Sequence, residues 1–193
     1  MLIILVAVIA FIAFYLWSLY NQFVTLKARI KASIQEIGNQ LKRQAELIPN
    51  LTQSVKGYMK HEKDIFKELT EARKAVSQVL ESGNAQKMIE AGDRLQAALA
   101  PIRAVFESTP QLQAVGPTNK LMDELTDTAD KVMYARRTLI DLTADYNIKI
   151  ATFPSNLVAK MFNFSAQPGL DMVTDTAALK VSHEETKTPK VDL

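Results

Sequence analysis

Apolar residues recur along much of this chain at intervals of three and four, which is the spacing of one face of an α-helix. One stripe runs from residue 30 to residue 48, and a second runs from residue 51 to residue 79. The first consists of Ile30, Ile34, Ile37, Leu41 and Ile48, and the second of Leu51, Val55, Tyr58, Ile65, Leu69, Ala72, Val76 and Val79. No stretch alternates polar and apolar residues as a strand would. The pattern therefore predicts an all-α protein.

Pro49 stands where the first two stripes meet. Proline lacks a backbone N–H and disfavours helical dihedral angles in the residue before it. The chain therefore either turns back at residues 47–50, as a helical hairpin, or continues through Pro49 as one long, bent helix. The connection would be very short and contains no glycine, whereas positions 41, 48, 51 and 55 stay in approximate helical register. These observations favour the kinked, continuous helix.

Two further stripes follow the stop signals Gly83 and Asn84. One spans residues 88–106, with Pro101 expected to kink it or mark a boundary, and the other spans residues 121–146 after a turn-rich connection. Four such stripes can bury one another in an elongated antiparallel bundle with coiled-coil-like packing. We assign this bundle to residues 23–164. Periodicity ends there, so residues 165–193 are expected to form a disordered tail.

The first 22 residues contain no charged side chain and are expected to anchor the chain in a membrane. Residues 2–20 are apolar except for Ser18, and as a helix these 19 positions would span roughly 28 Å, close to the hydrocarbon thickness of a bilayer. Tyr15, Trp17 and Tyr20 gather at the downstream end, where aromatic rings favour the interface. A cleavable signal peptide is the alternative, but a basic start and a small-residue cleavage site are not evident.

Lys27, Arg29 and Lys31 follow this segment directly. The positive-inside rule then favours a single-pass protein with its bulk domain in the cytoplasm. The same residues also fit the solvated face of an amphipathic helix, so the orientation rests on this rule alone.

The amino-acid composition limits the kinds of partner and of active site that this chain could have. The net charge of +2 gives no reason to expect a nucleic-acid partner, and the absence of cysteine excludes thiol catalysis and thiolate metal sites. The only histidines, His61 and His183, are far apart in sequence. His61 and Glu62 begin a zinc-protease motif, but Ile65 replaces its second histidine. We therefore predict no metal, no cofactor and no enzymatic activity.

Glu62 occupies a position of the second stripe where an apolar residue is expected. A buried carboxylate requires a partner, and Arg73, Arg136 and Arg137 are the candidates. We predict a polar layer inside the bundle that contains Glu62, Tyr58 and one of these arginines. Its favoured role is to set the register of the helices, and the alternative is a ligand or catalytic site.

Three residues near Pro49 invite local predictions. Asn50 can cap the backbone groups that the proline frees, and Gln40 is expected to join it across the kink. Gly57, inside a predicted helix, costs about 1 kcal/mol relative to alanine, which close approach of a neighbouring helix would offset.

The segment after residue 152 is expected to form a short helix capped by Ser155, which follows Pro154. Its apolar patch consists of Leu157, Val158, Met161, Phe162 and Phe164. The patch suits packing on the bundle, and a partner or membrane contact is the alternative.

The segment "QLKRQAELIPNLTQSVKGYMKHE", residues 40–62, resembles the signature of the LemA family of bacterial membrane proteins. A second resemblance covers Ala135-Arg136-Arg137, Tyr146-Asn147 and Phe153-Pro154-Ser155-Asn156-Leu157. Leu139-Ile140 departs from the family, which often has a further Tyr-Asn pair there. The resemblance implies a bacterial inner-membrane anchor followed by a bundle of long helices, and it implies no activity.

Two functions are compatible with these features. The first is an anchored interaction or scaffold protein that binds a protein partner or itself. The alternative is a small-ligand receptor or enzyme that uses the layer of Glu62 and arginine.

Overall fold

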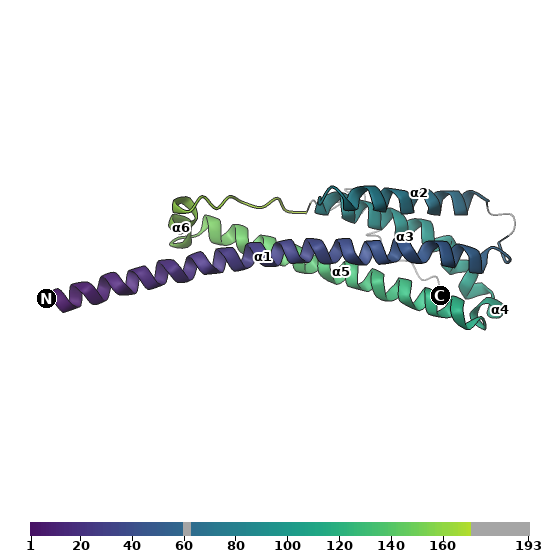
Figure 1. Ribbon diagram of the computed structural model, residues 1–193, viewed down its shortest axis with the longest axis horizontal. Helices are drawn as coiled ribbons and strands as arrows, with labels where there is room; N and C mark the ends of the chain where they lie inside the picture. Colours follow the sequence, from purple (N-terminus) through teal and green to yellow (C-terminus); the bar gives the residue numbers. More distant parts are fainter. Residues whose placement is uncertain (60–62, 171–193) are drawn as a thin grey trace, which may run out of the picture.

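The computed structural model of the chain describes residues 1–59 and 63–170, and these residues form six helices and no strand (Figure 1). The prediction of an all-α fold is therefore confirmed. The helices are α1 (Leu2–Val55), α2 (Lys63–Leu80), α3 (Ala85–Ser108), α4 (Pro110–Gln113), α5 (Gly116–Ala151) and α6 (Ser155–Met161).

Helix α1 organises the molecule, since its 54 residues extend over about 80 Å at 1.5 Å per residue. Its N-terminal part projects beyond the other helices, and its C-terminal part lies along the bundle (Figure 1). Within the described residues, α1 alone is long and apolar enough to cross a membrane. The helix passes through Pro49 without reversing, so the prediction of a continuous helix at this point is confirmed.

The chain reverses seven residues after Pro49, and this corrects the prediction of one helix from residue 51 to residue 79. Helix α1 ends at Val55, whose carbonyl accepts hydrogen bonds from the backbone N–H groups of Tyr58 (2.9 Å) and Met59 (3.2 Å). The apolar stripe continues across this turn because both helices bury residues at the same helical spacing. Periodicity alone therefore could not locate the turn.

The bundle consists of two closely packed pairs. Helix α5 lies along α1, and α2 lies mainly on α3. Gly92 of α3 allows a close approach to α1, because a Cβ atom at this position would lie 2.8 Å from Cδ2 of the buried Leu41. Pro101 does not end α3, which continues to Ser108. At its start, the Asn84 side chain accepts a 3.0 Å hydrogen bond from the N–H of Lys87.

The segment after α6 runs back along the bundle (Figure 1). Phe164 and Leu170 pack against the hydrophobic core, and Gln167 is hydrogen-bonded to α5. Residues 165–170, which were assigned to the disordered tail, are thus in contact with the bundle, and the packed segment extends beyond the boundary at residue 164. The rest of the predicted tail, residues 171–193, lies outside the described residues.

Candidate functional site

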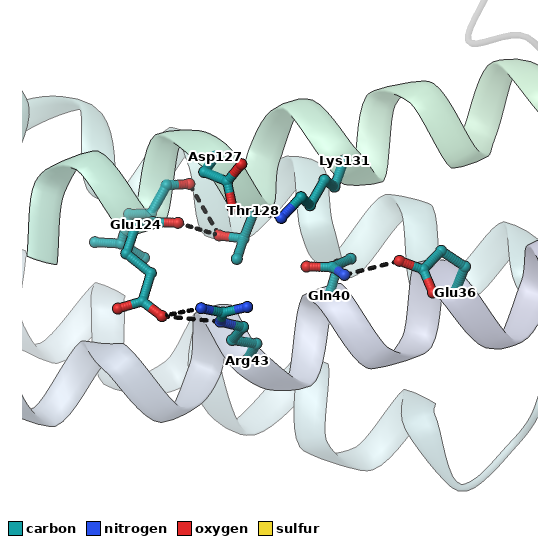
Figure 2. A network of polar contacts seen from close by, with 8 residues as sticks. Glu36, Gln40, Arg43, Glu124, Asp127, Thr128 and Lys131 are labelled. Atoms are coloured by element: carbon teal, nitrogen blue, oxygen red, sulfur yellow. Dashed lines mark hydrogen bonds and ion pairs between the residues drawn. The ribbon is translucent and has the colours of Figure 1, made fainter.

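A line of polar side chains follows the contact between α1 and α5 (Figure 2). Nε of Arg43 donates a 2.9 Å hydrogen bond to Oε1 of Glu124, and Nη2 of Arg43 binds the same oxygen. This hydrogen bond and the negative charge of Glu124 raise the pKa of Arg43 above its ordinary value. Both side chains are partly exposed, so the pair aligns the two helices more than it stabilises them.

Gln40 lies in the same line but does not contact Asn50. Its Nε2 donates to Oε1 of Glu36 at 2.8 Å, one helical turn earlier (Figure 2). The predicted contact of Gln40 with Asn50 across Pro49 is therefore wrong. Asn50 itself is exposed, and its side chain makes no hydrogen bond to another described residue, so it does not cap the backbone next to the proline.

A second polar chain lies between α1 and α3. Gln44 is wholly buried, and its Oε1 accepts a hydrogen bond from Nε2 of Gln96 at 3.3 Å. Oε1 of Gln96 in turn accepts a bond from Nη2 of Arg103 at 2.9 Å. Nε2 of Gln44 has no hydrogen-bond partner among the described residues. The bundle thus contains a polar layer, built from glutamine and arginine.

The layer predicted around Glu62 is not found in the described residues. Tyr58 is exposed in the turn after α1, because the helix ends before it, and Arg73 and Arg137 are exposed as well. Arg136 pairs instead with Asp93 of α3, with 3.4 Å between Nη1 and Oδ2. His61 and Glu62 themselves lie outside the described residues.

The prediction for Gly57 is wrong for the same reason. It lies in the exposed turn, and a Cβ atom added there would meet nothing within 4 Å. The close helix approach occurs at Gly92.

A hollow of about 300 Å³ opens between α1, α3 and α5, next to the buried amides. Its polar lining includes Gln44, Gln96, Asp93 and Arg136, and its apolar lining includes Met133. Amide groups donate and accept hydrogen bonds but do not exchange protons near neutral pH. The amides of this hollow therefore suit a role in helix register or in ligand binding.

The Tyr-Asn pair at the end of α5 holds the last described segment in place. Tyr146 is wholly buried, and its ring meets that of Phe23 edge-on at 5.8 Å between centroids. Burial raises the pKa of Tyr146. Asn147 makes two 2.9 Å hydrogen bonds with the backbone of Gln167, one to its carbonyl and one from its N–H. Tyr146 therefore fixes α5 on α1, and Asn147 fixes the chain that follows α6.

Pro154 follows a cis peptide bond between α5 and α6. Ser155 does not cap α6 as predicted. Its Oγ donates back to the carbonyls of Lys149 (2.6 Å) and Thr152 (3.0 Å), so it satisfies the end of α5. The backbone N–H of Asn156 donates to the carbonyl of Thr152 at 2.8 Å, and its side chain is half-buried. These residues shape the α5–α6 corner.

Sequence reasoning missed the residues that form the inner polar layer. Gln44 falls within the first apolar stripe, between Leu41 and Ile48, so a polar residue at a buried position was visible. Its partner Gln96 carried no comparable signal, because their pairing depends on how α3 lies on α1.

Comparison with known proteins identifies the family. The sequence model of the LemA family matches residues 33–191. The chain belongs to the LemA family. The match begins within α1, covers the other helices and extends past the described residues.

Relatives of this LemA chain include the magnetosome proteins MamQ 1 and MamQ 2 of Paramagnetospirillum magneticum AMB-1. Each is 26% identical over 187 residues, which covers 85% of this chain and 68% of the relative. The magnetosome protein MamQ of Magnetospirillum gryphiswaldense MSR-1 is 23% identical over 168 residues, covering 75% of this chain and 62% of the relative. Together with the apolar part of α1, these relationships indicate a membrane-associated helical protein.

Proposed function

We propose that this LemA protein is a single-pass membrane scaffold whose bundle binds a partner helix through α5. The partner helix belongs to another protein or to a second copy of this chain. The role is one of binding and not of catalysis.

The observation that carries the proposal is a second apolar seam on α5. Met133, Ile140 and Ile148 are exposed, with 38% to 64% of their surface accessible. Arg137 and Ala144 lie between them, so the five positions follow the three-and-four spacing of a helical seam. At 3.6 residues per turn, this seam lies on the side of α5 away from the residues that pack on α1, and at Met133 it borders the hollow between α1, α3 and α5.

This arrangement differs from ordinary surface exposure. Single exposed apolar residues are common on soluble proteins and require no partner. A row at seam spacing can accept the knobs of another helix, with Arg137 available for a charged partner residue. Helix α5 therefore presents one face to α1 and offers the exposed seam for association.

Site-specific photo-crosslinking tests the proposal. A photoreactive residue at position 140 of the full chain, in membranes of cells that make it, should give an adduct of defined mass. The same residue at the exposed position 74 of α2 is the matched control. An adduct of twice the chain mass identifies a second copy, and another mass identifies a different protein. Met133→Glu should remove either adduct, whereas no adduct at 140 beyond that at 74 would overturn the proposal.

We further propose that the bundle lies on the cytoplasmic side of a bacterial inner membrane. Lys27, Arg29 and Lys31, just beyond the apolar segment, support this orientation. The chain has no cysteine, so Lys74→Cys provides a unique label. A maleimide that does not cross membranes should label it only after lysis, and labelling in intact spheroplasts would contradict this orientation.

A second candidate function, binding of a small ligand, is favoured by the hollow beside Gln44. The Nε2 of this buried amide, unpartnered within the described part of the chain, carries two N–H groups that can donate hydrogen bonds to an acceptor. Screening for compounds that raise the melting temperature of the protein, but not that of its Gln44→Met variant, tests this candidate.

A further inference from the structure

Helix α6 lies beside the end of the apolar segment of α1 (Figure 1). The rings of Phe162 and Tyr20 are 4.7 Å apart, and those of Phe164 and Tyr20 are 5.7 Å apart. Tyr20 is also the last residue of the apolar run that begins at Leu2. A bilayer that holds this run therefore reaches the level of α6.

The surface of the α5–α6 corner at this level is apolar. Phe153 is 79% exposed, Leu157 is 55% exposed and Met161 is 61% exposed. Leu157 and Met161 are one helical turn apart and share a face of α6. These three side chains adjoin the N-terminal part of α1, which is also apolar and exposed. A continuous exposed apolar surface marks an interaction site.

We propose that α6 and the turn before it lie in the interfacial layer of the bilayer that holds α1. Phe153, Leu157 and Met161 then insert at the boundary between headgroups and acyl chains, as the apolar face of an interfacial helix does. Lys160 is exposed on the same short helix and can extend toward anionic headgroups. The inference rests on the proposed membrane anchor.

Position favours lipid over another occupant. Nζ of Lys149 donates a 2.9 Å hydrogen bond to Oε1 of Gln22, and this bond holds the corner at the start of the bundle. Gln22 lies two residues beyond the apolar run. A soluble partner would have to enter the headgroup layer to reach these side chains, whereas lipid is already present there. A second contact with the bilayer would also fix the tilt of the bundle, which one anchor helix alone leaves free.

Because the chain has no cysteine, single-cysteine variants can report on the depth of chosen positions. An environment-sensitive fluorophore is attached at Met161→Cys, and in a second variant at Phe153→Cys, in the full chain. The protein is reconstituted in vesicles of phosphatidylethanolamine and phosphatidylglycerol. Ala13→Cys, within the apolar run, is the embedded control, and Lys74→Cys, on α2, is the exposed control.

The labels at 161 and 153 should be quenched by lipids that carry a spin label near the headgroup, and quenched by iodide several-fold less than the label at 74. If both behave like position 74 while position 13 is embedded, the inference about α6 fails and the anchor stands. If position 13 is also open to iodide, the anchor and the proposed function fail. Self-quenching at position 161 without lipid quenching would assign the surface to a second copy and overturn the inference.

Discussion

Asn147 and Gln167, twenty positions apart, are joined by two hydrogen bonds of 2.9 Å each. The amide of Asn147 donates to the carbonyl of Gln167 and accepts from its N–H, as a neighbouring strand would. The segment after α6 is thereby tied to α5. Next to it, Phe164 stacks on Phe23 at 4.9 Å, so an aromatic contact and a polar contact hold the same segment.

Asn147→Ala should therefore loosen the segment around Gln167. Loss of both hydrogen bonds is expected to lower the free energy of unfolding by about 1–2 kcal/mol. Proteolysis or hydrogen exchange at residues 165–170 should increase more than elsewhere. Asn119→Ala is the control, since Asn119 is exposed and its side chain makes no hydrogen bond to another described residue. Unchanged protection at residues 165–170 would show that the two hydrogen bonds do not hold this segment.

Gly92 and Gly57 form a matched pair for testing helix contact. Gly92→Ala places a methyl group against Leu41 in the core, and it should cost about 1–3 kcal/mol of stability because the surrounding residues must shift. Gly57→Ala meets no neighbour and should be neutral or stabilise the protein by about 0.4–1 kcal/mol through the unfolded chain. Chemical denaturation measures both variants. Equal effects would contradict the close approach of α3 to α1.

The buried side-chain amide of Gln44 has an Nε2 that is unpartnered among the described residues. Substitutions of Gln44 can show whether this amide serves the packing of the helices or the binding of a ligand. Gln44→Met should cost only about 1 kcal/mol of stability, since the lost hydrogen bond from Gln96 is offset by removal of the unpaired Nε2 while the volume is nearly kept. Gln44→Glu should destabilise strongly because it buries a charge. Burial raises the pKa of the introduced carboxyl above its unfolded value, so the stability deficit should grow as the pH rises. A Gln44→Met variant that folds normally but loses biological function would assign the amide to a ligand site.

Because Tyr146 is buried, we expect the stability of the protein to depend on pH in the alkaline range. The folded state favours the neutral phenol and so raises the pKa of Tyr146 above the ordinary value of about 10. Below that value both states hold the proton, and this group adds no pH dependence. Above it, the unfolded chain loses its proton first, so stability falls as pH rises. Tyr146→Phe should weaken this decline, and an identical alkaline profile for both proteins would contradict the burial.

The helical character and the passage through Pro49 could be predicted because they depend on local spacing. The turn that begins after Val55 could not be located, since Val55, Tyr58 and Ile65 keep helical spacing across it. Gly57 was a usable signal, but it was interpreted as a close helix contact. The inner layer and the tie between Asn147 and Gln167 depend on tertiary packing, which pairs residues 52 and 20 positions apart. The spacing of apolar residues along the sequence does not predict which residues pair across helices.

Alkaline carbonate extraction of isolated membranes tests whether the apolar start of α1 holds the protein in a bilayer. The comparison variant Ile9→Lys/Ile12→Lys places two charges in the exposed part of α1, away from the bundle, and leaves the packing of the bundle unchanged. The full chain, with its intact mass, should remain in the membrane pellet, and the double variant should be released as a folded helical protein. Recovery of the unsubstituted chain in the supernatant at its full mass would contradict an α1 that is embedded in the bilayer.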